Sequence, residues 1–303
     1  MARGPTEVNE KPMIENIRRL MLAITALTSA VAASGQEPPK PPDQPGPDKS
    51  QYSLFHPAPR QYLREMRTDR PDQTESPFTV DAGHLQLEMD LGYAEVVRGS
   101  QERTTWGVVP FNLRLGLLNN VDLHFVVDTY AHARTEDVAN GSVDTASGFG
   151  DVQTRLKINF WGNEGGRTAF GVLPFVKWPL PRSGLRNGKT EGGVILPFAL
   201  DLGRGWSLGA MTEFDFVADD AGDRETQFVN SVTVGHSVTP KLEVYAEFYT
   251  VTRRSPDFRW QGQADAGWTY ALTQNLQLDA GCNFGVTRPA PDFQPFVGIS
   301  FRR

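Results

Sequence analysis

The chain has 303 residues, of which 39% are hydrophobic, with one cysteine and a formal net charge of −6 at pH 7. The acidic balance argues against a nucleic-acid partner, which requires a basic face, and a single cysteine excludes an internal disulfide and a cysteine-based metal site. No apolar run reaches the ~18–20 residues that a membrane-spanning helix needs, so a helical membrane protein is excluded.

Residues 1–35 have the composition of a signal peptide. Basic residues within 11–19 precede the short apolar run LMLAITALTSAVAA, and residues 30–32 (AVA) offer small side chains for cleavage. Met13 is an alternative start, and an amphipathic N-terminal helix of the mature protein is the alternative interpretation. We therefore predict export across an inner membrane, followed by a proline-rich periplasmic lead at 36–67.

From Thr79 onward, about twelve segments alternate apolar and polar residues, which is the signal of a β-strand. In HLQLEMDLGY, for example, the odd positions are apolar and the even positions are polar. The segments lie near 84–93, 105–117, 121–130, 151–160, 168–178, 193–202, 206–217, 226–237, 242–250, 260–272, 276–286 and 293–301.

The links between these segments alternate in length along the chain. The short links are NN, GNEGG, GRG, VTPK and TQN, and the longer, more charged ones include VRGSQERT and AHARTEDVANGSVDTASG. A barrel threaded through a membrane has this alternation, because tight turns lie on one side and long loops on the other.

The alternation alone does not decide which face of the sheet is apolar, and a soluble periplasmic barrel or sandwich is the alternative. The signal peptide, a lumen too wide for apolar side chains to fill and aromatic residues near the strand ends favour the membrane. These aromatic residues are Tyr93, Trp106, Tyr130, Trp161, Trp178, Trp206, Trp268 and Tyr270. We predict an all-β fold, an antiparallel transmembrane β-barrel of about twelve strands over 68–303, in the bacterial outer membrane.

The last segment, FQPFVGISFRR, tests the same prediction. Outer-membrane barrels commonly end on an aromatic residue with apolar residues two and four positions before it, a pattern read by the barrel-insertion machinery. Phe301, Ile299 and Val297 match this pattern, whereas Arg302 and Arg303 depart from it by extending the chain.

Three stretches carry a family resemblance: TDRPDQTESPFTVDAGHLQLE (68–88), GFGDVQTRLKINFWG (148–162) and the terminal FQPFVGISFRR. Together they resemble the bacterial family labelled "putative meta-pathway of phenol degradation", whose superfamily includes the exporter of a functional-amyloid secretion system. The resemblance covers roughly 68–303 and implies a twelve-stranded outer-membrane barrel with a transport role. Nothing in the residues indicates phenol chemistry.

The decamer TDRPDQTESP (68–77) concentrates charge at Asp69, Arg70, Asp72 and Glu75. We interpret it as a plug-like or entry segment that folds into the lumen or lies at its periplasmic mouth, and we expect residues 51–77 to plug or gate the pore. A ligand site and a catalytic carboxylate site are the alternatives. The five histidines lie on separate segments, so we expect structural roles for them and no metal site.

Alternation assigns a strongly acidic set of residues to the lumen face. The acids are Glu88, Asp90, Asp122, Asp128, Asp151, Asp201, Glu213, Asp215, Glu243, Glu247, Asp265 and Asp279, and the bases are Arg114, Arg155, Lys157 and Lys177. Charged rings in a pore wall set its ion preference, so an open pore is expected to favour cations. The alternative is a closed barrel in which the bases form cross-barrel networks with their acidic neighbours.

We predict that the protein passively transports small hydrophilic or weakly amphipathic solutes, without enzymatic activity and without a cofactor. A protein exporter of the amyloid-secretion type, a closed structural or adhesion barrel, and an outer-membrane enzyme are the alternatives. The expected partners are outer-membrane lipid, the barrel-insertion machinery and a small-molecule solute that the sequence does not identify. No nucleic-acid partner is expected, and assembly into a homo-oligomer is left open.

Overall fold

The computed structural model describes residues 48–180, 185, 188–218, 223–254 and 259–303. The predicted signal peptide and the first part of the predicted lead fall on 1–47, outside the described residues. Within the described ranges, no helix is long and apolar enough to cross a membrane, and one 3-10 turn, η1 (Arg60–Tyr62), is the only helical element.

Fifteen β segments form one antiparallel sheet whose order closes on itself. They are β1 (Leu85–Val97), β2 (Gln101–Val108), β3 (Phe111–Leu118), β4 (Val121–Val127), β5 (Tyr130–Asp137), β6 (Val143–Phe149), β7 (Val152–Trp161), β8 (Thr168–Lys177), β9 (Glu191–Gly203), β10 (Trp206–Ala218), β11 (Arg224–Ser237), β12 (Leu242–Arg253), β13 (Gln261–Thr273), β14 (Leu276–Gly285) and β15 (Phe293–Arg302).

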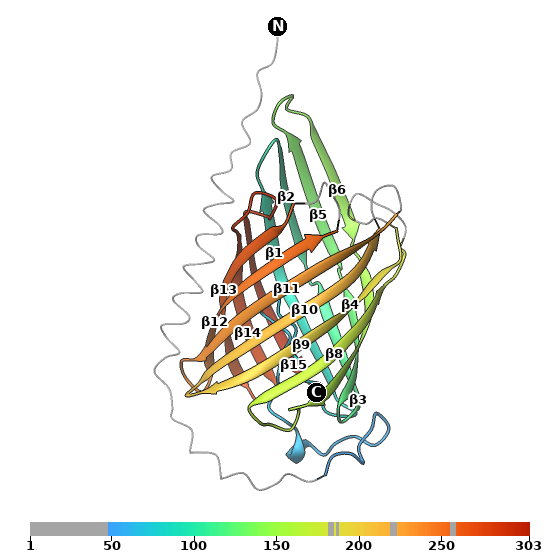
Figure 1. Ribbon diagram of the computed structural model, residues 1–303, viewed down its shortest axis with the longest axis vertical. Coiled ribbons are helices and arrows are strands. Elements are labelled where there is room, and N and C mark those ends of the chain that lie inside the picture. The colour runs from blue at the N-terminus through green and yellow to red at the C-terminus, as the bar shows by residue number, and fades with distance from the viewer. Residues whose placement is uncertain (1–47, 181–184, 186–187, 219–222, 255–258) are drawn as a thin grey trace. The chain divides into compact units, whose positions relative to one another are not determined.

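Three pairs of these segments are halves of single barrel strands, so the barrel has twelve strands. β2 continues into β3, β4 into β5 and β6 into β7, with breaks of two residues at 109–110, 128–129 and 150–151. The halves pair in the same order on both sides of the breaks. On one side β2 pairs with β5 and β5 with β6, and on the other β3 pairs with β4 and β4 with β7. Closure comes from β15, which pairs with β1 from Gln86↔Arg302 to Val96↔Phe293. The predicted twelve-stranded antiparallel barrel is confirmed (Figure 1).

The two faces of the wall differ in polarity in the sense expected of a membrane barrel. On β1, Gln86 and Glu88 point inward and are buried, whereas Leu85 and Leu91 on the alternate positions are exposed on the outside. Exposed aromatic side chains such as Trp206 and Phe216 continue this outer surface around the barrel. The alternation of the sequence thus places polar side chains in the lumen and apolar ones toward lipid.

Two of the predicted links are shorter than the sequence suggested. VRGSQERT contracts to residues 98–100, because β1 and β2 extend into it. AHARTEDVANGSVDTASG was predicted as a loop and is mostly a hairpin, in which β5 and β6 pair across residues 138–142. The sequence did not predict these two strands, because their alanine, threonine and charged residues give no clear alternation of apolar and polar side chains. Figure 1 shows β2, β5 and β6 rising beyond the other strands at one end.

Tyr93 was expected among the aromatic residues at the membrane interface, and this was wrong. A bulge on β1 between Asp90 and Gly92 shifts the alternation by one residue. Tyr93 consequently lines an internal cavity together with Asp90 and Glu95.

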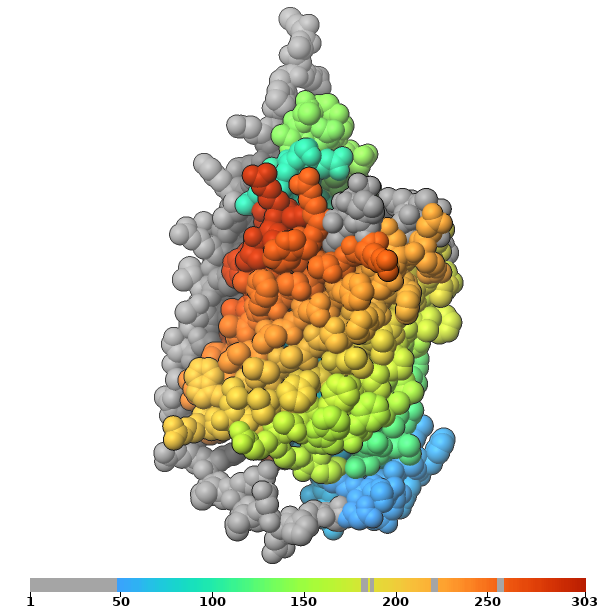
Figure 2. Space-filling view, in the orientation of Figure 1, coloured from blue at the N-terminus to red at the C-terminus, as the bar shows by residue number. Residues whose placement is uncertain are grey.

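The two ends of the barrel differ, and we name them by their links. The turn end carries the links at 119–120, 162–167, 204–205, 238–241 and 274–275, none longer than six residues, and the loop end carries the others, which include the longer links at 178–190, 254–260 and 286–292. Residues 48–67, part of the predicted lead, cover the turn end, where Leu54 N donates to Leu117 O at 2.8 Å. In Figure 2 these N-terminal residues, in blue, lie at the lower end of the barrel.

Candidate functional site: the barrel interior

Residues 68–80, named here the lumen segment, pass through the interior of the barrel and contact much of its wall. Its side chains and backbone bond to residues on β1, β3, β4, β7, β11, β12, β13 and β14. These contacts use side chains of the wall, and no described residue of the segment joins the sheet. The interior is therefore occupied by a polar strap that is not itself part of the wall.

Asp69 lies at the centre of a buried charge cluster. Its Oδ1 is 2.5 Å from Lys157 Nζ and its Oδ2 is 3.1 Å from Arg114 Nη1. Arg114 also contacts Glu88 at 2.8 Å and Asp122 at 3.1 Å. The side chains of Arg114, Lys157 and Asp122 are 0% exposed, so each charge depends on these partners in place of water.

The Arg70 side chain packs against a row of residues from three neighbouring strands. Asp90 on β1 and Asp279 on β14 both pair with Gly298 on β15, so the three residues form one row across the wall. Arg70 Nη2 lies 2.6 Å from Asp279 Oδ1 and 2.7 Å from Asp90 Oδ1. A Cβ atom on Gly298 would lie 2.7 Å from Arg70 Nε, so the guanidinium occupies the space where a larger residue would project.

The tip of the lumen segment reaches the opposite wall through hydrogen bonds. Gln73 Nε2 donates to Gln263 Oε1 at 2.7 Å and to Asp265 Oδ2 at 2.9 Å. Gln73 N donates to Glu247 Oε2 at 2.8 Å, and the Thr74 hydroxyl donates to the other oxygen of Glu247. Gln73 and Thr74 thus attach the tip to β12 and β13 without a cation.

The pKa values of two acids of the segment shift in opposite directions. Burial by itself would raise the pKa of Asp69, but Arg114 and Lys157 outweigh it and hold that pKa below its ordinary value. Burial raises the pKa of Asp72 well above its ordinary value, and the negative charge of Glu247 raises it further. Asp69 is therefore a docking contact for the segment, and Asp72 in its charged form opposes docking.

A second charge cluster lies at the turn end, and the sequence analysis did not predict it. Asp81 is 1% exposed and lies 3.3 Å from Lys49, 3.3 Å from Arg64 and 3.7 Å from Arg302. Lys49 and Arg64 also contact Glu164 in the β7–β8 link. Arg302, which departs from the usual aromatic ending, points into this cluster and donates to Arg64 O at 2.8 Å. The only sequence signal was basic residues in an otherwise unassigned lead.

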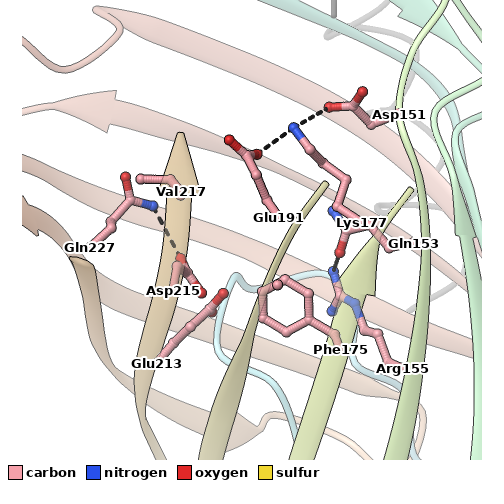
Figure 3. A pocket seen from close by; sticks show the side chains of 11 residues that line it. Asp151, Gln153, Arg155, Phe175, Lys177, Glu191, Glu213, Asp215, Val217 and Gln227 are labelled. Carbon is pink, nitrogen blue, oxygen red and sulfur yellow. Dashed lines mark hydrogen bonds and ion pairs between the residues drawn. The ribbon is translucent and has the colours of Figure 1, made fainter. Parts of the chain in front are cut away.

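Two cavities lie in the interior on the loop-end side of the lumen segment. One has a volume of ≈600 Å³ and is lined by Gln73, Tyr93, Arg103, Asp128 and other residues. The other, of ≈280 Å³, lies against β7 to β11 and is shown in Figure 3, where Lys177 stands between Asp151 and Glu191. These cavities leave the loop-end half of the lumen with open space.

The residues that alternation assigned to the lumen face fall into three groups. Those contacting the lumen segment are Glu88, Asp90, Arg114, Asp122, Arg155, Lys157, Glu247, Asp265 and Asp279. Those lining the cavities without touching the segment are Asp128, Asp151, Lys177, Glu213 and Asp215. Glu243 and Asp201 lie toward the turn end, where Ser207 Oγ donates to Glu243 at 3.4 Å and Asp201 accepts from the backbone of its own turn.

The buried histidines make local contacts with the protein. His84 Nε2 is 2.7 Å from Ala58 O, and His124 Nε2 is 2.9 Å from Asp122 Oδ1. Among the described residues, no group of three or more His, Cys, Asp or Glu is arranged to hold a metal ion.

A closed twelve-stranded barrel with an apolar belt outside and a charged interior defines the class, an outer-membrane-type β-barrel. The chain belongs to the family described as "Putative MetA-pathway of phenol degradation", whose model matches residues 68–302. The COG4313 outer membrane channel from Pseudomonas putida F1 has a similar structure, with a TM-score of 0.55 and 11% identity, covering 78% of this chain and 100% of that chain. At this identity the likeness shows the fold alone.

A second similar structure is the NanC porin, with a TM-score of 0.47 and 13% identity over 72% of this chain and 98% of that chain. No curated protein sequence matches this chain.

Proposed function

We propose that the protein is a passive channel for small hydrophilic or weakly amphipathic solutes, and that the lumen segment closes it in this structure. In outer-membrane barrels the short turns face the periplasm, so the turn end and residues 48–67 belong on that side. The two internal cavities then open toward the cell exterior, above the closed level.

The observation that carries the proposal is how the lumen segment is held. It is fixed by side-chain hydrogen bonds and ion pairs, and it contributes no strand to the sheet. The segment can therefore leave the lumen while every backbone hydrogen bond of the wall stays in place. Its removal would expose the acids of β1, β12, β13 and β14, which gives an open lumen a preference for cations.

A reversible covalent lock tests this proposal on the full chain. The hydroxyl oxygens of Thr74, on the lumen segment, and Ser231, on β11, lie 2.6 Å apart, a spacing that suits a disulfide between cysteines at these positions. We expect Thr74→Cys with Ser231→Cys, in a Cys282→Ser background, to give no single-channel steps when oxidised and cation-selective steps when reduced.

The matched control places a disulfide within the wall. Thr212 Oγ1 and Asn230 Oδ1 face each other across β10 and β11 at 2.9 Å, so Thr212→Cys with Asn230→Cys should leave conductance unchanged by oxidation. Steps of equal frequency in the oxidised lumen lock would show that the segment does not close the pore.

A closed structural barrel is the second candidate, and the fully buried Arg114–Asp122 pair favours it. Silence of the folded wild type and of the reduced lock at all voltages, with heat-modifiable migration on a gel, would establish that candidate and refute the channel.

A further inference from the structure

The smaller cavity lies beside Gly193 on β9, whose cross-strand neighbours Phe175 and Asp215 line it. Gly193 pairs with Phe175 on β8 and with Asp215 on β10, so the three residues form one row across the wall. A Cβ atom on Gly193 would lie 2.5 Å from Asp215 Oδ1 and 2.9 Å from Phe175 Cε1. The glycine therefore lets the Asp215 carboxylate lie beside the aromatic ring, facing a cavity of ≈280 Å³.

The bases of this cavity are already paired with other acids. Lys177 Nζ lies 2.5 Å from Glu191 and 3.2 Å from Asp151. Arg155 contacts Glu75 of the lumen segment, and its second nitrogen donates to Gln153 at 3.2 Å. Figure 3 shows Lys177 directed to Asp151 and Glu191, and Arg155 directed to Gln153.

Two acids of the cavity, Asp215 and Glu213, form no ion pair among the described residues. Asp215 is 6% exposed, its Oδ2 accepts a hydrogen bond from Gln227 at 3.1 Å, and its buried Oδ1 has no hydrogen-bond partner among the described residues. Glu213 precedes it by two residues on the same face of β10 and forms no ion pair in the described part of the chain. A buried carboxylate without a partner is costly, and a second carboxyl beside it adds repulsion.

The surroundings of the two carboxyls decide which cation would suit them. The same cavity is lined by the Phe175 ring and the Val217 side chain, and among the described residues no group of three or more His, Cys, Asp or Glu is arranged to hold a metal ion. A hard metal ion prefers a shell of several oxygens, whereas an organic ammonium ion combines N–H donors with an apolar body that packs on an aromatic ring. A comparable arrangement exists in this barrel, where Arg70 lies over Gly298 between two acids.

We propose that this cavity binds the primary ammonium group of a small organic cation. Asp215 Oδ1 and Glu213 accept its N–H hydrogen bonds, and its short alkyl chain lies against Phe175 and Val217. The cavity has the volume of about nine water molecules, which accommodates an ammonium group with a short alkyl chain. As the solute class of the channel, this inference rests on the proposed function, but binding itself does not require an open pore.

Calorimetric titration of the detergent-solubilised full chain with butylammonium tests the site. Butanol has the same carbon chain without the charge, and sodium has the charge without the chain. We expect butylammonium to bind at least about tenfold more tightly than either. The nearly isosteric substitutions Asp215→Asn and Glu213→Gln should each weaken it by about tenfold or more, and Phe175→Leu by about threefold.

The matched control is Glu243→Gln, which removes an interior acid at the turn end, bonded to Ser207. It should leave butylammonium affinity unchanged. Equal binding of butanol, or unchanged affinity in folded Asp215→Asn, would overturn the site.

The bilayer experiment separates this inference from the proposed function. With the lumen lock reduced, butylammonium should carry current, and Asp215→Asn should reduce its permeability relative to sodium. Binding without any current would refute the channel and leave the site intact. Current with unchanged selectivity in Asp215→Asn would refute the site and leave the channel intact.

Discussion

Arg70 and Asp279, 209 positions apart in the chain, form an ion pair with Nη2 2.6 Å from Oδ1. Asp279 lies on β14 and the second partner of Arg70, Asp90, lies on β1, the two strands that flank β15. The lumen segment is therefore anchored where the first and last strands of the barrel meet.

Replacing Arg70 should release the lumen segment. Arg70→Met leaves Asp90 and Asp279 buried without their cation, which weakens docking by about 3 kcal/mol and raises the undocked fraction about a hundredfold. Single-channel recording should show frequent openings. Arg60→Met, an exposed arginine on η1, is the control and should behave like the wild type. An Arg70→Met channel as closed as the wild type would contradict the anchoring role.

Gly298→Ala should produce the same opening without altering any charge. Its methyl group would occupy the space of the Arg70 guanidinium. The guanidinium cannot move away without breaking its ion pair with Asp90 or with Asp279. We expect an open probability at least about tenfold above the wild type, since a loss of about 1.4 kcal/mol is a factor of ten. Gly99→Ala, where the nearest atom to the new methyl group is 3.8 Å away, is the matched control.

Asp72→Asn should keep the channel more closed at neutral pH. The docked pKa of Asp72 is raised by burial and by Glu247, so its cost to docking is present at neutral pH and disappears as pH falls toward about 4. The docked pKa of Asp69 is lowered, so its contribution to docking is present above about pH 4 and is lost below it.

Wild-type open probability should therefore fall from pH 7 toward about 4 and rise again below that. Asp72→Asn should start lower at pH 7 and vary less down to about pH 4. The pKa of Glu75 is also raised, by burial and by Asp69. Glu75 therefore favours opening at neutral pH as Asp72 does, so the open probability of Asp72→Asn should still decrease somewhat as pH falls. Single-channel recordings from pH 7 to below pH 4 check this. If Asp72→Asn opens more than the wild type at pH 7, charged Asp72 does not oppose docking.

The barrel could be predicted because its signal is repeated on every strand. Alternation along one strand, as in Leu85 to Leu91, is weak alone, but twelve such segments with links of alternating length leave few other folds. The hairpin of β5 and β6 was missed because its residues are mostly small or charged. The inward position of Tyr93 was missed because a bulge leaves no mark in composition.

The sequence allowed us to predict which charged residues face the interior, but not which base forms an ion pair with which acid. Alternation placed acids such as Glu88 and Asp279 on one face, and the charged decamer containing Asp69 and Arg70 suggested a plug. Which base meets which acid depends on strand order and register, because Arg70 and Asp279 become neighbours only when the sheet closes. The role of Gly193 depends equally on its two cross-strand partners.

Asp81→Asn tests the charge cluster at the turn end. Asp81 is 1% exposed and neutralises Lys49, Arg64 and Arg302, and its Oδ2 also accepts a hydrogen bond from Arg64 N at 3.1 Å. An amide in its place leaves these cations facing one another with little water. This should weaken the attachment of residues 48–67 to the barrel by about 3–5 kcal/mol, so that these residues detach.

Limited proteolysis would detect that detachment as rapid cleavage within 48–67 while the barrel stays heat-modifiable on a gel. The control is Glu65→Gln, because Glu65 is 79% exposed and its 3.6 Å pair with Arg67 lies in solvent, where a salt bridge contributes about 0–1 kcal/mol. Equal protection of both variants would mean that apolar contacts of Tyr52, Ala58 and Ala82 hold this region without the cluster. Cleavage of Asp81→Asn alone would establish Asp81 as the residue that fixes residues 48–67 to the barrel.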